Sequence, residues 1–108
     1  MKTLKFRKEL ADQILDGKKT STWRLFDDKN LSNGDEISLI IWETGEQFAV
    51  AKIIDVIEKS FNELNEKDFE GHEKFNSKEQ MYKNYSKFYN KQINQFTKLK
   101  IIKFKLIK

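Results

Sequence analysis

The chain has 108 residues, a hydrophobic fraction of 38% and no cysteine, which predicts one packed domain over residues 1–108 and excludes disulfides and thiolate metal sites. Its net charge of +4 is only mildly basic, so the distribution of charge says more than the sum. Because no window approaches the roughly 20 apolar residues of a membrane span and the charged N-terminus has no signal-peptide core, we expect a cytoplasmic protein without a membrane partner.

The first quarter of the chain predicts a strand, a helix and a second strand. Thr3–Phe6 forms the first strand, and Glu9–Asp16 has the apolar spacing of a short, half-buried helix. Gly17 supplies the C-terminal cap of that helix. Lys18–Leu25 is rich in threonine and aromatic residues, which predicts a strand whose Trp23 points to the core.

The middle of the chain predicts a hairpin of two strands. Asn33-Gly34-Asp35 is a strong turn signal. The next segment, Glu36–Trp42, is a strand with apolar residues on both sides. Glu43–Glu46 then predicts a hairpin turn into a long strand over Gln47–Glu58, and we expect the two strands to pair antiparallel.

Two capping boxes predict helical segments in the second half. Ser60 with Glu63 opens a short helical turn, and Ser77 with Gln80 opens a longer helix. The longer helix places four side chains on one face, which favours a core role for them: Met81, Tyr85, Phe88 and Tyr89. The tyrosine hydroxyls can still reach a cleft.

The C-terminal strand changes phase at Ile101-Ile102. Apolar residues alternate with lysines on both sides of this pair, but the alternation slips by one residue, which predicts a β-bulge. Bulges bend strands around small barrels. The order of the elements therefore predicts an α+β domain built on a curved, mostly antiparallel sheet.

Charge is distributed unevenly along the second half. Glu58–Glu73 contains six acids and two lysines, whereas Lys91–Lys108 contains six lysines and no acid. Such asymmetry can steer a polyanion onto one face. Lysines on the solvent side of a strand also keep a sheet edge soluble, so both interpretations stay open.

The residues do not predict a metal or a cofactor. The chain has one histidine, His72, and its carboxylates are scattered, whereas typical zinc sites draw on several His or Cys ligands. Glu70, His72 and Glu73 can form at most a weak metal cluster, and Asp27 with Asp28 can hold Mg²⁺ only beside a phosphate. Gly17-Lys18-Lys19-Thr20 ends a helix, so it is not a P-loop.

Gly17 to Arg24 is nevertheless the richest stretch in chemistry. The donors of Lys18, Lys19, Thr20 and Arg24 can bind a phosphate or a base edge. A lysine with a lowered pKa can also activate a hydroxyl such as that of Thr22. On a regular strand Lys19 and Thr22 point to opposite faces. The two can meet only if Lys19 lies in an irregular turn.

The segments Gly17-Lys18-Lys19-Thr20-Ser21-Thr22-Trp23-Arg24 and Leu31-Ser32-Asn33-Gly34-Asp35 resemble the ASCH domain family of the PUA-like superfamily. Glu70–Phe75, before a tyrosine-rich helix, and Ile101–Phe104 are similar to small stand-alone bacterial members. This resemblance implies a small PUA-like β-barrel with two to three flanking helices, and a cleft suited to RNA or nucleotides.

Within that family, the small N(4)-acetylcytidine amidohydrolases carry a Gly-x-Lys-x-x-Thr-x-Arg pattern, which Gly17, Lys19, Thr22 and Arg24 match. The resemblance implies Lys19 as base, Thr22 as nucleophile, Arg24 as an anchor or oxyanion donor, and a downstream glutamate as proton shuttle. The spacing leaves this glutamate open between Glu70 and Glu73. The continuation after Arg24 differs from the amidohydrolase branch, so the substrate does not carry over.

We therefore expect a protein that binds RNA or a nucleotide in a cleft lined by this motif. We expect five residues to contact the ligand: Lys18, Thr20, Arg24, His72 and Tyr85. The alternative is an amidohydrolase acting on N(4)-acetylcytidine or a related modified nucleoside, and a further alternative is a ribonuclease. The oligomeric state stays open.

Overall fold

A computed structural model describes residues 2–26 and 29–107. Its strands are β1 (Lys2–Phe6), β2 (Ser21–Arg24), β3 (Glu36–Ile41), β4 (Gln47–Ser60) and β5 (Lys98–Ile107), and its α-helices are α1 (Lys8–Leu15) and α2 (Lys78–Tyr89). Two short 3-10 segments, η1 (Phe61–Glu63) and η2 (Glu66–Phe69), follow β4. None of the described helices is long and apolar enough to cross a membrane.

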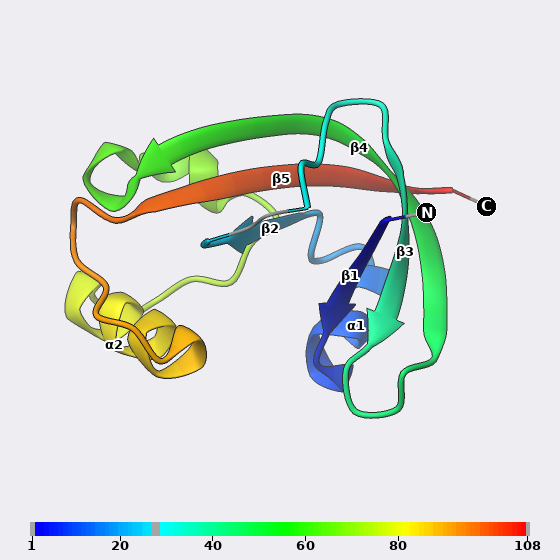
Figure 1. Cartoon of the computed structure of the whole chain (residues 1–108), viewed down its shortest axis with the longest axis horizontal. Coiled ribbons are helices and arrows are strands. Elements are labelled where there is room, and N and C mark those ends of the chain that lie inside the picture. Colours follow the sequence, from blue (N-terminus) through cyan, green and yellow to red (C-terminus); the bar gives the residue numbers. More distant parts are fainter. Residues whose placement is uncertain (1, 27–28, 108) are drawn as a thin grey trace.

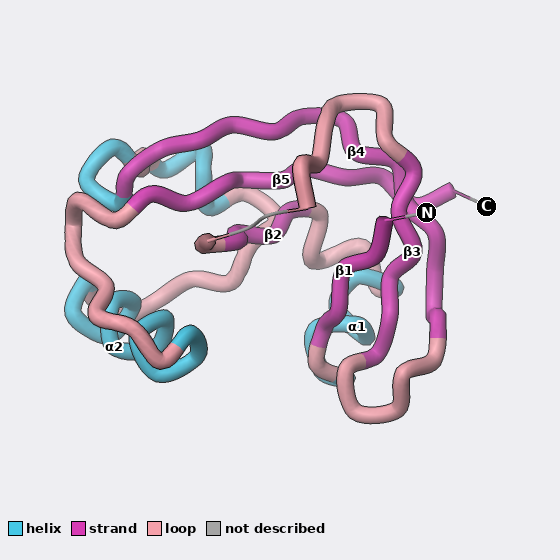
Figure 2. Tube along the Cα trace, in the orientation of Figure 1, coloured by secondary structure: helices cyan, strands magenta, loops and turns pink. Residues whose placement is uncertain are grey.

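The five strands form one curled sheet in the order β1-β3-β4-β5-β2 (Figure 1). Only β1 and β3 pair in parallel, and the other three pairs are antiparallel. The sheet curls into a half-barrel, with α1 and α2 near opposite ends of the molecule (Figure 2). The predicted α+β class, with a curved and mostly antiparallel sheet, is confirmed.

One end of the half-barrel holds a cluster of mostly aliphatic side chains, which we call the barrel core. Its members come from β1, α1, β3, β4 and β5 and from the loop before β3, and all are at most 5% exposed. They are Leu4, Phe6, Ile14, Leu31, Ile37, Leu39, Ala51, Ile53, Ile102 and Phe104. The large apolar area that they remove from water stabilises the sheet.

The other end holds a second cluster, which we call the aromatic cluster. Its buried members are Trp23, Leu25, Phe61, Met81, Ile93, Leu99 and Ile101, and partly buried rings pack against them. Those rings include Phe69, Phe75, Tyr82, Tyr85 and Tyr89. Helix α2 covers this cluster, and Trp23 points into it as predicted.

The predicted bulge at Ile101-Ile102 is wrong, and the two clusters explain the pattern that suggested it. The register of β5 runs unbroken there, with Ile101 opposite Ile57 and Ile102 opposite Val56, and the irregularity lies in β4 between Ile53 and Asp55. Successive strand residues face opposite sides of a sheet. Ile101 belongs to the aromatic cluster and Ile102 to the barrel core. The phase slips because the buried face of β5 changes at this pair.

Two further predictions need correction. The second strand begins at Ser21 rather than Lys18, because the backbone N–H groups of Lys18 and Lys19 both donate to the carbonyl of Gln13 and extend the end of α1. On α2, Phe88 does not join the buried face: its side chain is 63% exposed, whereas Met81 is 4% exposed. The apolar stripe of α2 turns toward Tyr82 instead, which packs against the aromatic cluster.

Candidate functional site

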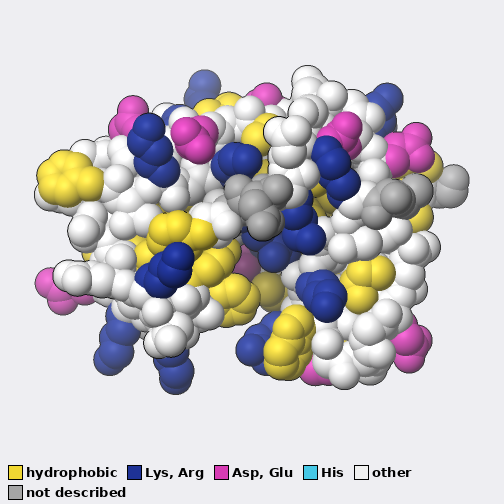
Figure 3. Space-filling view, in the orientation of Figure 1, with side chains coloured by type: hydrophobic (Ala, Val, Ile, Leu, Met, Phe, Trp, Pro, Cys, Tyr) yellow, Lys and Arg dark blue, Asp and Glu magenta, His cyan; other side chains and the backbone are white. Residues whose placement is uncertain are grey.

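A cavity of about 750 Å³ lies between α2 and the end of the half-barrel that carries β1 and α1. Figure 3 shows Lys and Arg side chains in this hollow, with hydrophobic side chains on both sides of it. The lining residues come from four parts of the chain: Lys5, Phe6, Arg7 and Leu10; Lys19, Thr22, Trp23 and Arg24; Trp42; and His72, Glu73, Phe75, Asn84, Tyr85, Lys87, Phe88 and Tyr89. Five of them are cationic and one is acidic.

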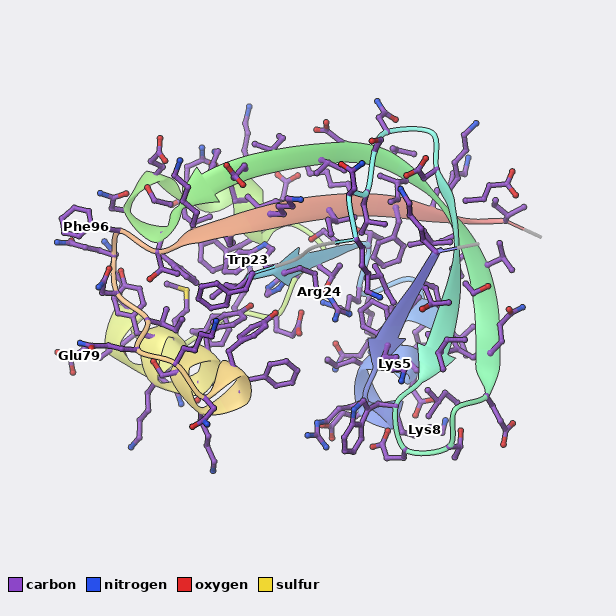
Figure 4. The ribbon with its side chains drawn as sticks, in the orientation of Figure 1. Lys5, Lys8, Trp23, Arg24, Glu79 and Phe96 are labelled. Atoms are coloured by element: carbon purple, nitrogen blue, oxygen red, sulfur yellow. The ribbon has the colours of Figure 1, made fainter. Side chains whose placement is uncertain are left out.

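The cavity opens at the seam of the half-barrel, because β1 and β2 are the two edge strands and do not pair with each other. Arg24 of β2 bridges this seam. Its Nη2 donates a hydrogen bond of 2.7 Å to the carbonyl of Lys5 on β1, and its Cζ lies 4.8 Å from the centre of the Phe6 ring. Figure 4 labels Arg24 and Lys5 on the two sides of the seam. The guanidinium is therefore held in one place at the cavity wall.

Lys19 enters the cavity from the turn between α1 and β2. Its residue is only 3% exposed, and its Nζ donates to Oε2 of Glu73 over 2.6 Å. Because Lys19 precedes the first residue of β2, it escapes the alternation that separates Lys19 from Thr22 on a regular strand. Lys19 therefore lies in an irregular turn, which is the condition under which it can meet Thr22, and both residues line the same cavity.

Gly71 holds the segment that carries Glu73. Its carbonyl accepts hydrogen bonds from the backbone N–H groups of Thr20 (2.9 Å) and Ser21 (3.2 Å), at the entry of β2. Its φ of +70° favours glycine, and a Cβ at this position would lie 1.9 Å from Oγ1 of Thr20. The close approach places His72 and Glu73 at the cavity.

The ion pair of Lys19 and Glu73 sets the charge state of the site. Burial lowers the pKa of Lys19 although the carboxylate of Glu73 opposes this shift, and the charge of Arg24 lowers it further. Burial by itself would raise the pKa of Glu73, but the charge of Lys19, the charge of His72 and hydrogen bonds together lower it. Glu73 is therefore ionised at neutral pH, and Lys19 is easier to deprotonate than an exposed lysine.

His72 is a neutral ring stacked on Trp23. The ring centroids are 4.0 Å apart and the planes differ by 14°. Burial, followed by the charge of Lys19, lowers the pKa of His72 to about 4. At neutral pH the 3.5 Å contact from Nδ1 to Oε2 of Glu73 is therefore not an ion pair. Nδ1 donates to the carbonyl of Glu73 over 2.8 Å, which leaves Nε2 as an acceptor.

Tyrosine and tryptophan rings form the wall of the cavity on the α2 side. Tyr85 lies parallel to Trp23 at 6.3 Å and to Tyr89 at 6.4 Å. Burial, together with the charge of Glu73, raises the pKa of Tyr85, so its hydroxyl stays protonated. Nε1 of Trp23 is buried and has no hydrogen-bond partner among the residues described. Such an unmade bond costs about 1–3 kcal/mol.

The structure brings six of the predicted site residues to this cavity: Lys19, Thr22, Arg24, His72, Glu73 and Tyr85. Lys18, Thr20 and Glu70 do not line it. Lys18 is exposed, and its Nζ lies 3.8 Å from Oδ2 of Asp16. Thr20 packs against Gly71, and the carbonyl of Glu70 accepts from the hydroxyl of Ser21.

The predicted metal positions do not form a cluster in the part of the chain that the structure describes. No three His, Asp or Glu side chains converge there. Glu73 turns toward Lys19, His72 stacks on Trp23 and Glu70 is exposed. Asp27 and Asp28 lie outside the described residues.

Sequence reasoning missed the rim of the cavity. Lys5, Arg7, Trp42, Lys87 and Phe88 all line it, yet none of them belongs to the motif. For the three cations among them, the signal in the sequence was the exposure expected of a charged residue at a strand or helix end, and Trp42 and Phe88 carried no such signal. Their convergence depends on the parallel pairing of β1 with β3, which local patterns do not encode.

Comparisons with known proteins agree with this fold. The family model described as ASCH domain matches residues 2–108, and no curated protein matches the sequence. The solved ASCH domain from Lactobacillus crispatus JV V101 is 16% identical and superposes with a TM-score of 0.72, over 97% of this chain and 79% of that chain.

Two further solved structures are similar. Protein EF3133 from Enterococcus faecalis V583 is 14% identical with a TM-score of 0.79, over 99% of this chain and 76% of that chain. The hypothetical protein PH0355 is 27% identical with a TM-score of 0.74, over 99% of this chain and 100% of that chain. With the family model matched over residues 2–108 on this curled half-barrel, the chain belongs to the ASCH domain family, whose fold is PUA-like.

Proposed function

We propose that the cavity at the seam binds RNA or a nucleotide. The observation that carries this proposal is the lining, which combines five cations with one carboxylate that is already paired to Lys19. A cluster of five cations with a single carboxylate, beside aromatic rings, suits a ligand that has both phosphates and flat bases. Membership of the ASCH family supports the same ligand class.

The arrangement offers separate places for the two parts of a nucleotide. Arg24 presents a planar donor group fixed by Lys5 and Phe6, which suits a phosphate oxygen. On the other wall, Nε2 of His72 can accept from a base, and the ring of Tyr85 can contact its face. The volume of about 750 Å³ falls within the roughly 300–1,000 Å³ typical of ligand pockets.

Fluorescence anisotropy with a labelled single-stranded RNA tests the proposal. Arg7→Gln and Lys87→Gln each remove one cation that lines the cavity, whereas Lys105→Gln removes an exposed lysine of β5 outside it. We expect the two cavity variants to weaken binding and to lower the slope of log affinity against log salt by about 0.7 for each phosphate that the protein no longer neutralises. Lys105→Gln should bind like the natural protein.

Equal losses in all three variants would show that RNA binds through net charge alone, and absence of binding at low salt would reject the proposal. The same RNA is recovered after the measurement and sized on a gel. RNA that is shortened by the natural protein, but not by a variant without Lys19, would indicate that the protein is a ribonuclease.

The ion pair of buried Lys19 with half-buried Glu73 favours a second candidate, an amidohydrolase acting on N(4)-acetylcytidine or a related nucleoside. In this scheme Glu73 takes a proton from Lys19, and neutral Lys19 then accepts the hydroxyl proton as Oγ1 of Thr22 adds to the amide carbonyl. Arg24 stabilises the oxyanion. Glu73 protonates the leaving amine as the C–N bond breaks, and water hydrolyses the Thr22 ester to release acetate.

Release of cytidine from N(4)-acetylcytidine checks this candidate. Lys19→Ala and Thr22→Ala should each abolish release. Their matched controls are Lys18→Ala and Thr20→Ala, because these residues lie outside the cavity lining. Release that is missing in the natural protein, or that all four variants retain, would reject the amidohydrolase while leaving the binding proposal intact.

A further inference from the structure

Two large aromatic side chains stand exposed on the rim of the cavity. Trp42, just after β3, is 56% exposed, and Phe88 of α2 is 63% exposed. Neither belongs to the barrel core or to the aromatic cluster, yet both line the cavity. They approach it from opposite sides, because the cavity lining includes residues of β1 and of α2, and these elements stand apart in Figure 1.

The backbone that carries Trp42 and the ring next to Phe88 are each anchored by their surroundings. The backbone N–H of Trp42 donates to the carbonyl of Phe6 over 2.8 Å, and the carboxylate of Glu43 accepts from the N–H of Lys8 at the start of α1, over 3.0 Å. On the other rim, Phe88 packs edge-on against Tyr89 at 5.0 Å. The hydroxyl of Tyr89 is fixed in turn by the N–H of Leu25.

A cation accompanies the aromatic side chains of each rim. Cζ of Arg7 lies 4.5 Å from the centre of the Trp42 ring. On the α2 rim, Nζ of Lys91 lies 4.2 Å from the centre of the Phe26 ring, and both Phe26 and Phe88 pack edge-on against Tyr89. A fixed exposed ring beside a cation matches what an unpaired nucleotide needs, which is a surface for its base and a partner for its phosphate.

We propose that these two rims stack the bases that flank the nucleotide in the cavity, so that the ligand is single-stranded RNA of at least three nucleotides rather than a free nucleotide. This inference rests on the proposed binding of RNA or nucleotides at the cavity. A duplex does not suit the site, because its bases are stacked on each other and cannot offer their faces to Trp42 and Phe88. Arg7 and Lys87 then meet the phosphates between the three nucleotides.

The test compares three ligands: a nucleoside monophosphate, a five-nucleotide RNA, and the same RNA with abasic positions on both sides of its central nucleotide. The abasic RNA keeps every phosphate and loses only the flanking bases. We expect the natural protein to bind the complete RNA roughly 10-fold or more tightly than the abasic one.

Variants assign the effect to the rims. Trp42→Ala and Phe88→Ala should each lose affinity for the complete RNA while their affinity for the abasic RNA stays unchanged. Phe96→Ala is the matched control, because Phe96 is 68% exposed, does not line the cavity and lies far from Arg24 (Figure 4). It should bind all three ligands like the natural protein.

Equal affinity for complete and abasic RNA would overturn the rim proposal and leave binding at the cavity standing. No binding of any of the three ligands would reject the underlying proposed function instead. A DNA of the same sequence that binds more tightly than the RNA would overturn the assignment to RNA.

Discussion

The barrel core and the aromatic cluster bury side chains in different ways. Leu4, Ile37, Leu39 and Ile53 of the barrel core are 0% exposed, and their side chains are purely aliphatic. The aromatic cluster instead ends in rings that are only partly buried, and one of its buried groups, Nε1 of Trp23, lacks a hydrogen-bond partner among the described residues. Apart from Phe6, which lines the cavity, the first cluster is closed to solvent, whereas the second forms a wall of the cavity.

This difference separates stability from function along the sheet. A change in the barrel core away from Phe6 alters packing outside the cavity lining, so its expected effect is on the free energy of unfolding. A change beside the aromatic cluster alters Trp23, His72 and Tyr85, which belong to the fold and to the cavity at once. Mutations can therefore test which contacts serve only the fold.

The largest effect is expected in the barrel core. Ile53→Ala removes a fully buried side chain from β4 and leaves a cavity, so the free energy of unfolding should fall by about 3–5 kcal/mol. Ile54→Ala is the matched control. Ile54 is the next residue of the same strand but is 49% exposed, so this variant should lose less than about 1 kcal/mol. Urea denaturation measures both, and similar losses would contradict the assignment of Ile53 to the core.

Acid should weaken the side of the molecule that holds His72. Its pKa falls from an ordinary value of 6.5 to about 4 on folding, so the neutral ring contributes stability that is complete above pH 6.5 and is lost as the pH falls toward 4. The difference between these two pKa values corresponds to a loss of about 3 kcal/mol in the free energy of unfolding. His72 faces Lys19 and Glu73, and Glu73, whose pKa is also lowered, adds a loss at lower pH.

Comparison with His72→Phe isolates this contribution, because phenylalanine can keep a ring beside Trp23 but does not titrate. The unfolding free energy of both proteins is measured by denaturation at several pH values. The natural protein should lose about 3 kcal/mol more than the variant between pH 6.5 and 4. Parallel pH profiles would show that His72 is charged or exposed in the folded protein.

A smaller effect is expected at Gly71. Gly71→Ala forces a positive φ on alanine and places its Cβ against Thr20, so it should cost about 2–3 kcal/mol and displace His72 and Glu73. Gly17→Ala shares the positive φ, +83°, but its Cβ meets open space, so it should cost only about 1 kcal/mol. Thermal denaturation and RNA binding are measured together. Binding that Gly71→Ala leaves intact would argue against the role of this segment.

Local patterns in the sequence predicted most of the elements of the fold. The hairpin of β3 and β4 was found because Gly45 lies in a short turn between two apolar runs, and the capping box at Ser60 was found because its partner Glu63 is three residues away. The order of the strands was not predicted. It depends on pairing between distant segments, such as β2 with β5.

The site could be predicted only as far as the motif extends. Lys19, Thr22 and Arg24 are close in sequence, but Lys19 and Glu73 are 54 residues apart, so spacing could not decide between Glu70 and Glu73. Gly71 decides it, because its docking on Thr20 leaves Glu70 exposed and Glu73 at the cavity. Their functional roles stay predictions.

The smallest effect on stability is expected for Lys19→Met, which should nevertheless have a large effect on ligand binding. Burial lowers the pKa of Lys19, so folding at neutral pH includes the cost of burying its charge, which the pair with Glu73 only partly offsets. Methionine fills a similar volume without that cost, and the side chain of Glu73 is 32% exposed and can be solvated. The free energy of unfolding should therefore change by no more than about 1 kcal/mol.

Ligand binding should nevertheless be abolished in Lys19→Met, because the uncompensated carboxylate of Glu73 then repels a phosphate at the cavity. Glu73→Gln in the same background removes that charge, so the double variant should recover part of the affinity. Denaturation and RNA anisotropy on the three proteins measure the two properties separately. A large loss of stability in Lys19→Met would show that the pair with Glu73 holds the fold together. Lys19 would then serve the fold as well as the cavity, and the proposed division between a stabilising barrel core and a functional cavity side would be wrong for this residue.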